Sequence, residues 1–400
     1  MAQLSKTFTI FIIDHDLENL LRFRRYFAGK KFLVYFLKNH MEAQAVMAGV
    51  VPDIIICRVD SPDGEEVHFL ELLQYKYPRT IRIVVSDEKN RSLLFKLLIS
   101  GLTQRFLCFP WQKNHISDVL DRDLATRSMI RATSCWSYLE KGRNMPNVPT
   151  VVREIEQLLC ESEYSLGQVS RIIEREPILA SRLLQIVNSA AFTKSGTVSD
   201  LLLALSYIGV HNLREILLFI SAIEGFSFDK RCMQMVKGIA NHSFLCSRLA
   251  REIASQIDPS TEKEASIAAL LHDMGKLILL ANSCPQLIKA ISKTGDNGHL
   301  WVDKKFEDEY FGFRYSEIGS CLMLLWNLPM SLIEIVVGIE YPLLELSGTA
   351  KSVAIADRCL QEAAVGGDAD LELETLIPAL PVAKWRLLAR EFIDSSDKIF

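Results

Sequence analysis

The residues best suited to chemistry are a histidine and an aspartate that stand side by side, His272 and Asp273, in the apolar stretch LLHDMGKL. Burying an ionisable pair is costly unless its members are paired or bind a metal ion. Taken alone, such a dipeptide is more typical of a satisfied core pair. His242 upstream and Asp357 downstream lie in further stretches with helical spacing. Separated imidazoles and carboxylates on successive helices favour a metal site or its remnant.

Short apolar runs recur through about the first 120 residues of the chain. They lie at 8–13, 32–37, 53–57, 81–85 and 105–108. Such runs suit buried strands of a parallel sheet that is covered on both faces. Segments with helical spacing separate them, so strand and helix alternate. The pattern predicts an α/β doubly wound domain.

The pattern changes after about residue 116. A helical stretch reaches Tyr138, and the prolines within 145–149 break it, which predicts a domain boundary. The partial apolar stripe of this helix fits either a dimer contact or a spacer packed on one of the domains. Beyond Pro149 nearly every segment has helical spacing, so the second half is predicted to be an all-α domain.

Bulk properties exclude several classes of protein. A chain of 400 residues is expected to form two domains, and its net charge of -4 gives no general attraction to nucleic acid or to a membrane surface. No apolar run is long enough to cross a bilayer, and the first residues predict a β-strand rather than a secretory signal. The nine cysteines include no CxxC pair, which predicts buried free thiols and a reducing cytoplasm.

The first half, residues 6–122, resembles the receiver domain of two-component response regulators. Five motifs in the expected order carry the resemblance. They are Asp14-His15-Asp16, Pro52-Asp53, Pro62-Asp63-Gly64, Ser86, and Phe106-Leu107-Cys108-Phe109-Pro110.

This resemblance implies a phosphoaccepting aspartate, an acidic pair that holds a hard cation, and a lysine that pairs with the phosphate. Arg58 stands at the aspartate position, Phe109 at the lysine position, and His15 at the second acidic position. A guanidinium offers no nucleophilic oxygen. We therefore predict a pseudo-receiver that serves docking or dimerisation. Asp60, the alternative acceptor, is expected to point in a different direction from the strand end.

Arg58 has a second predicted role. If it lies among Asp14 and Asp16, its charge replaces the missing cation through charge-assisted hydrogen bonds and locks the domain in one conformation. The alternative is that Arg58 turns out to solvent.

The second half resembles the HDOD family, within the HD superfamily of metal-dependent phosphohydrolases. The stretches 183–190, 204–209, 270–277, 312–319 and 325–329 carry the resemblance. The implied organisation is a pseudo-receiver at 1–122, a linker helix at 123–145, an HDOD domain at 146–345 and a C-terminal helical extension at 346–400.

Departures from the catalytic relatives bear on activity. Cyclic-di-GMP phosphodiesterases of the HD-GYP type hold two or three metal ions with extra histidines, and here Tyr315 and Glu340-Tyr341 stand at such positions. The remaining set could hold one ion but not two. We predict no catalytic residue and a polar core without a cofactor, with one residual divalent ion as the alternative. The candidate ligands are His242, His272, Asp273 and Asp357, with Glu340 as an unusual fifth.

The leading hypothesis is a non-catalytic signalling protein that acts through protein–protein contacts. Family analogy suggests sensor kinases or cyclic-di-GMP enzymes as partners, and the linker helix suggests a homodimer. No nucleic-acid or membrane partner is expected. Two alternatives stay open: a degenerate one-metal nucleotide phosphohydrolase, and a module that binds a nucleotide or cyclic dinucleotide without turnover.

Overall fold

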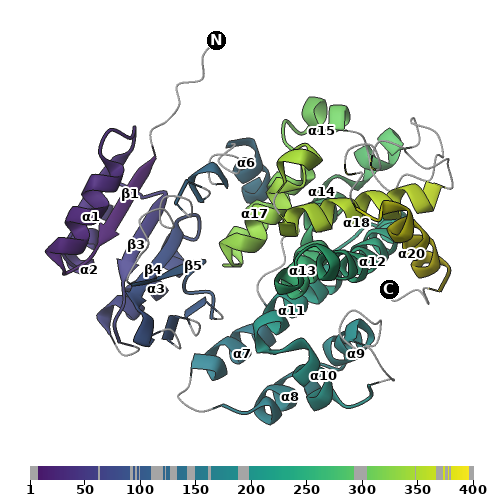
Figure 1. Ribbon diagram of the computed structural model, residues 1–400, viewed down its shortest axis with the longest axis horizontal. Coiled ribbons are helices and arrows are strands. Elements are labelled where there is room, and N and C mark those ends of the chain that lie inside the picture. The colour runs from purple at the N-terminus through teal and green to yellow at the C-terminus, as the bar shows by residue number, and fades with distance from the viewer. Residues whose placement is uncertain are drawn as a thin grey trace. The chain divides into compact units, whose positions relative to one another are not determined.

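The computed structural model describes most of the chain, in two compact units (Figure 1). The first unit comprises residues 1–128 with 159–162 and 323–331, and the second comprises the remainder. The described residues are 8–61, 64–90, 93–94, 97–98, 100–109, 120–121, 123–126, 133–141, 149–160, 164–187, 198–291, 304–346, 348–365, 373, 377 and 380–395. Pro62 and Asp63, Pro110, and residues 188–190 of the predicted stretch 183–190 lie outside them.

A five-stranded parallel sheet forms the centre of the first unit, with strand order β2-β1-β3-β4-β5. This is the flavodoxin-like order, in which the chain reverses direction beside β1. The α/β class predicted for this half is confirmed. The strands coincide with the predicted apolar runs: β1 (Thr9–Ile13), β2 (Leu33–Leu37), β3 (Ile54–Arg58), β4 (Ile81–Asp87) and β5 (Arg105–Phe109).

Both faces of this sheet are covered, which explains the continuous apolar runs. Phe11 and Ile55 belong to one cluster with residues of α2 (His40–Met47) and α3 (Glu65–Lys76). Neighbouring strand residues such as Ile10 are equally buried. α1 (Leu17–Phe27) begins where the Asp16 carboxylate accepts a hydrogen bond from the Glu18 amide at 2.8 Å. A short 3-10 turn, η1 (Glu88–Asn90), follows β4.

The described elements of the second unit are helical, so the all-α prediction is confirmed. They include the long α12 (Met233–Ile257), which packs against α13 (Glu262–Leu271) and α18 (Gly348–Val365); α20 (Val382–Ser395) packs on α18 (Figure 1). The other helices are α7 (Thr150–Cys160), α8 (Leu166–Glu174), α9 (Pro177–Ile186), α10 (Leu201–Ile208), α11 (Val210–Gly225), α14 (Met274–Ile291), α15 (Lys304–Tyr310), α16 (Tyr315–Leu325) and α17 (Met330–Gly338).

The described end of the predicted linker helix is α6 (Thr133–Lys141), and it packs on the helical unit. The Tyr138 hydroxyl lies 2.7 Å from the Ser283 hydroxyl, and the Tyr138 ring meets Phe311 and Phe313 edge-on. Trp136 is buried as well. This segment therefore behaves as a packed spacer. Much of the rest of the linker lies outside the described residues.

One sequence prediction is wrong: Cys232 and Cys284 form a disulfide. Cys232 ends the 3-10 turn η3 (Lys230–Cys232) before α12, and Cys284 lies beside a break in α14 at Ser283. Packing of these elements brings the two Cα atoms to 6.3 Å, within the usual range for a disulfide. The sequence separation of 52 positions hid this proximity from sequence reasoning.

Among the described residues, the stretch Pro259–Ala290 is long and apolar enough to cross a membrane, which corrects the prediction that the chain has no such run. Its candidate window is 89% buried inside the unit, as expected of a core helix. It contains α13, the His-Asp pair that follows α13, and all of α14 except the last residue.

Candidate functional sites

Residues of the predicted phosphorylation pocket gather at the carboxyl edge of the sheet. Arg58 is the last residue of β3, Phe109 ends β5, and Ser86 is the last but one of β4. Asp14 follows β1 directly. Parallel strands all end at this edge, so the order of motifs was sufficient to place these residues together.

The Arg58 guanidinium forms two ion pairs at this edge. Its Nε donates to Asp60 Oδ2 at 2.7 Å, and its Nη2 donates to Asp87 Oδ2 at 3.2 Å. The guanidinium carbon lies 5.2 Å from the centre of the Phe109 ring, a cation–π contact. Burial alone would lower the pKa of Arg58, but the carboxylates of Asp60, Asp14 and Asp87 raise it on balance. The Arg58 side chain is only 13% exposed, so it does not turn out to solvent.

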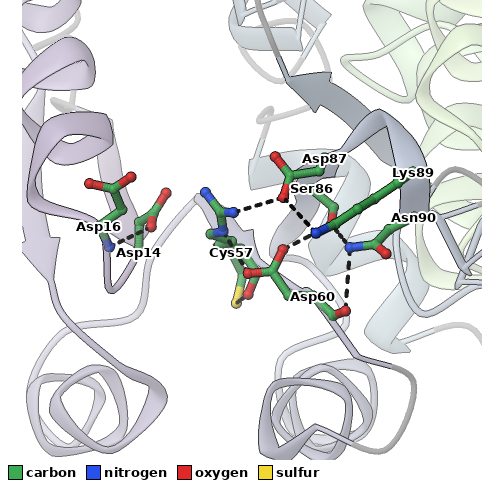
Figure 2. A network of polar contacts seen from close by, with 9 residues as sticks. Asp14, Asp16, Cys57, Asp60, Ser86, Asp87, Lys89 and Asn90 are labelled. Carbon is green, nitrogen blue, oxygen red and sulfur yellow. Dashed lines mark hydrogen bonds and ion pairs between the residues drawn. The ribbon is translucent and has the colours of Figure 1, made fainter.

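Asp60 belongs to the same network, which corrects the expectation that it points elsewhere (Figure 2). Its Oδ1 accepts a hydrogen bond from the Ser86 hydroxyl at 3.1 Å. Asn90 donates to Ser86 Oγ at 2.9 Å and to the Asp60 carbonyl at 3.3 Å. Both carboxylate oxygens of Asp60 are therefore engaged. Sequence reasoning missed Asp87 and Asn90. Only their position after the apolar part of β4 could have indicated that they lie at this edge of the sheet.

The expected partners of Arg58 have other roles. Asp14 is buried and accepts a hydrogen bond from the Asp16 amide at 2.8 Å, and burial raises its pKa. The Asp16 side chain caps α1, and His15 is exposed. Arg58 is thus paired with Asp60 and Asp87 in place of Asp14 and Asp16. Because Arg58 already neutralises two carboxylates, this donor set does not fit a hard divalent cation.

The His-Asp pair of the second unit lies between helices rather than inside one. α13 ends at Leu271, and α14 begins at Met274. His272 Nδ1 donates to the Ala269 carbonyl at 2.6 Å. In a continuous helix that carbonyl would accept from the Asp273 amide, so the imidazole competes with helix continuation. The prediction of a helical position for the pair is corrected accordingly.

Two helices, α12 and α18, bring His242 and Asp357 to this junction. His242 of α12 donates from Nε2 to Asp357 Oδ1 of α18 at 2.8 Å, and Gln361 donates to the same oxygen at 2.8 Å. His272 Nε2 lies 3.6 Å from that oxygen. Burial would raise the pKa of Asp357, but His242 and His272 hold it well below its usual range. For His272, burial acts to lower the pKa, and the nearby carboxylates raise it overall.

Lys276 is a functional residue that sequence reasoning overlooked. Its ammonium lies 2.7 Å from Asp273 Oδ1 and 4.5 Å from the centre of the Tyr315 ring. Burial acts to lower the pKa of Lys276, but Asp273 and Asp357 raise it on balance. Lys276 follows Asp273 by three residues at the start of a helix, a spacing that could have predicted their ion pair. The buried Lys276 ammonium therefore occupies the place beside Asp273 that a metal ion bound to this carboxylate would take.

Tyr315 and Glu340 stand where catalytic relatives have extra histidines, and both side chains are engaged in other contacts. The Tyr315 ring faces Lys276, and burial raises the pKa of its phenol far above the usual range. Glu340 accepts a hydrogen bond from Ser316 at 3.1 Å and pairs with Lys304 at 2.7 Å. By contrast, His272 Nε2 is buried and lies 3.2 Å from Asp273 Oδ1, but among the described residues it forms no hydrogen bond of good geometry. The residues present fit one metal ion beside His272 and do not fit a bridged pair.

Comparison with known proteins identifies the helical region. Residues 145–341 match the HDOD domain family, so the chain contains an HDOD domain there. A protein of Treponema pallidum (strain Nichols), described as uncharacterized, is 24% identical over 199 residues; the match covers 48% of this chain and 37% of that protein. The chain thus spans well under half the length of this relative.

Solved structures resemble both halves of the chain. An HDOD domain protein of unknown function from Geobacter sulfurreducens is 18% identical, covers 67% of this chain and 93% of its own, and has a TM-score of 0.47. A signal receiver domain of an HD domain-containing protein from Pseudomonas fluorescens Pf-5 is 20% identical over 33% of this chain and 98% of its own, with a TM-score of 0.31. No residue role follows from these likenesses.

Proposed function

We propose that this chain is a signalling protein without phosphoryl-transfer chemistry, which acts by binding other proteins. One observation carries the proposal: a guanidinium, not a carboxylate, ends β3, and it is held by Asp60 and Asp87. The receiver-like unit therefore has neither a nucleophile at that position nor a free acidic pair for Mg²⁺. It is a pseudo-receiver whose conformation does not depend on phosphorylation.

The HDOD domain, on this proposal, binds but does not hydrolyse. Lys276 neutralises Asp273, and Lys304 neutralises Glu340, so the carboxylates that could hold a second ion are paired. We expect no turnover of cyclic dinucleotides or guanosine polyphosphates with Mn²⁺ or Mg²⁺. A chromatographic product assay with the full chain tests this, and an HD-GYP phosphodiesterase provides the positive control. Turnover that is lost in His272→Gln would contradict the proposal.

We infer that the partners are signalling proteins, with sensor kinases and cyclic-di-GMP enzymes as the first candidates and a homodimer as the simplest assembly. No nucleic acid or membrane partner is proposed. Affinity capture with the full chain, followed by reconstitution from purified components, tests this. Capture should be equal in the presence and absence of acetyl phosphate, since binding is independent of phosphorylation. Binding that appears only after acetyl phosphate treatment would contradict it.

We also propose a cytoplasmic location. A reducing compartment would convert the Cys232–Cys284 disulfide to two thiols. Alkylation in intact cells, followed by mass spectrometry of the peptides, distinguishes the two states. Full alkylation of both cysteines supports the cytoplasm, and complete protection by a disulfide points to an oxidising compartment.

Replacing Arg58 should destabilise the first unit. The Arg58→Met variant removes the ion-pair partner of Asp60 and leaves Asp87 with the more distant Lys89, at 3.9 Å. Because the two acidic side chains are more than a third exposed, we expect a loss of only about 1–2 kcal/mol. Urea unfolding followed by hydrogen exchange of β3 peptides measures it.

Arg22→Met is the matched control for this substitution. Arg22 pairs with Glu18 on the surface of α1 and is 48% exposed, so its loss should cost no more than about 0.5 kcal/mol. Equal effects of the two variants would show that the Arg58 network does not stabilise the unit.

A further inference from the structure

A third donor lies beside the two histidines of the HDOD domain: the thiol of Cys246. One ligand atom each from His242, Cys246 and His272 lies within 4.8 Å of the other two. His242 and Cys246 are four residues apart on α12 and therefore share one helix face. Cys246 and His272 are completely buried. Two imidazoles and a thiol are the donors of a borderline or soft transition metal, not of Mg²⁺ or Ca²⁺.

The hydrogen bonds around these residues leave one nitrogen of each imidazole with its lone pair. A carbonyl can only accept, so His272 Nδ1 carries the proton that bonds to Ala269, and Nε2 of the neutral ring has the lone pair. This Nε2 lies 3.2 Å from Asp273 Oδ1 and 3.6 Å from Asp357 Oδ1. His242 Nε2 lies 2.8 Å from Asp357 Oδ1, and donation of this hydrogen bond to the carboxylate leaves Nδ1 of the neutral ring with the lone pair. Metal-binding histidines usually donate their other nitrogen to a carboxylate or carbonyl in this way. Each neutral imidazole in this arrangement has one nitrogen with a lone pair for a metal ion.

We propose that the HDOD domain binds a single zinc-class ion through His242, Cys246 and His272. Asp357 orients His242 and is not a ligand, and Asp273 remains paired with Lys276. Bonds of about 2.0–2.3 Å require the three side chains to close by roughly 1 Å. The fourth position of a tetrahedral ion is left to water. The set differs from the one predicted from sequence, in which two aspartates joined the histidines and no thiol took part.

Such an ion would join elements that are distant in the sequence. Cys246 and His242 lie on α12, whereas His272 lies between α13 and α14. An ion bound to the native state alone stabilises that state in proportion to its affinity and concentration. Metal removal should therefore lower the unfolding temperature of the domain, a measurement that does not depend on any catalytic activity.

Cobalt substitution tests the ligand set directly. The full chain is stripped with a chelator, and one equivalent of Co²⁺ is added while absorption is recorded. We expect tight binding of one ion and a thiolate-to-cobalt charge-transfer band in the near ultraviolet, both reversed by one equivalent of Zn²⁺. Binding without that band, or no binding to the folded wild-type chain, would overturn the proposal, and neither result requires a variant.

Variants identify the thiol and separate ligands from orienting groups. Cys246→Ser should lose the charge-transfer band, and Cys321→Ser, an equally buried cysteine outside the group, should keep it. Asp357→Asn should keep the band and weaken binding by about 10–100-fold, as for other groups that orient a ligand. Circular dichroism of each stripped variant confirms folding. A band that survives in Cys246→Ser, or disappears in Asp357→Asn at saturating Co²⁺, would contradict the assignment.

Discussion

Replacing Gly275 by alanine is expected to destabilise the HDOD domain by more than about 4 kcal/mol, because the added methyl group meets backbone rather than flexible side chains. A Cβ at Gly275 would lie 1.7 Å from the Tyr315 carbonyl oxygen and 3.0 Å from the Gly319 amide nitrogen. α14 and α16 could accommodate it only by moving apart. Such a shift would displace Lys276 from the Tyr315 ring and disturb the His272–Asp273 turn.

Urea unfolding monitored by circular dichroism measures this loss. Gly348→Ala is the matched control, because no heavy atom lies within 4 Å of the corresponding Cβ. It should change the stability by no more than about 1 kcal/mol. A Gly275→Ala variant as stable as wild type would show that α14 and α16 do not pack this closely.

Replacing Glu215 by glutamine is expected to stabilise the protein at alkaline pH by about 3 kcal/mol. Glu215 lies buried on α11, and desolvation raises its pKa to about 7 from the usual 4.5. Arg214 on the same helix lowers this pKa, but it is itself paired with Glu156, whose charge raises it. Ionisation of the Glu215 carboxyl therefore costs free energy in the folded protein.

The sign of the pH effect follows from the raised pKa. Below pH 4.5 the carboxyl is protonated in both the folded and the unfolded chain, and no penalty exists. As the pH rises towards 7 the unfolded chain releases this proton first, so the stability of the wild type falls by up to about 1.4 kcal/mol per pH unit. Above pH 7 both states are ionised and the loss is constant. Glutamine abolishes this dependence.

Stability measured by urea unfolding between pH 4.5 and 8.5 tests the expectation. The difference between Glu215→Gln and wild type should grow with pH and level off above about 7. Glu391→Gln, on the exposed face of α20, is the control and should give a difference that does not vary with pH. A pH-independent difference for Glu215→Gln would show that this carboxyl is not buried as described.

The fold could be predicted from the sequence because burial leaves recognisable patterns of apolar residues. Buried strands of a parallel sheet give continuous apolar runs, and amphipathic helices repeat every three to four residues. Arg58 and Phe109 could be placed at the sheet edge, because each follows an apolar run directly. The His-Asp pair could be recognised because ionisable residues interrupt an apolar stretch, although its position in a turn depends on a hydrogen bond to Ala269.

Contacts between distant elements could not be predicted in this way. Pairing of Arg58 with Asp60 and Asp87 depends on side-chain directions beyond the end of a strand, where the alternation of faces no longer applies. The Cys232–Cys284 pair depends on how a short turn packs against a break in α14. Cys246 looked like one of several buried thiols, since its proximity to His272 arises only from the packing of α12 against α13.

Treatment of the full chain with acetyl phosphate and Mg²⁺, followed by intact-mass measurement, tests the central claim most directly. A competent receiver domain in the same reaction is the positive control. With Arg58 held by Asp60 and Asp87, we expect no added phosphoryl group at any Mg²⁺ concentration. A Mg²⁺-dependent phosphoryl adduct on Asp60 or Asp14, lost when that residue is replaced by asparagine, would contradict the account.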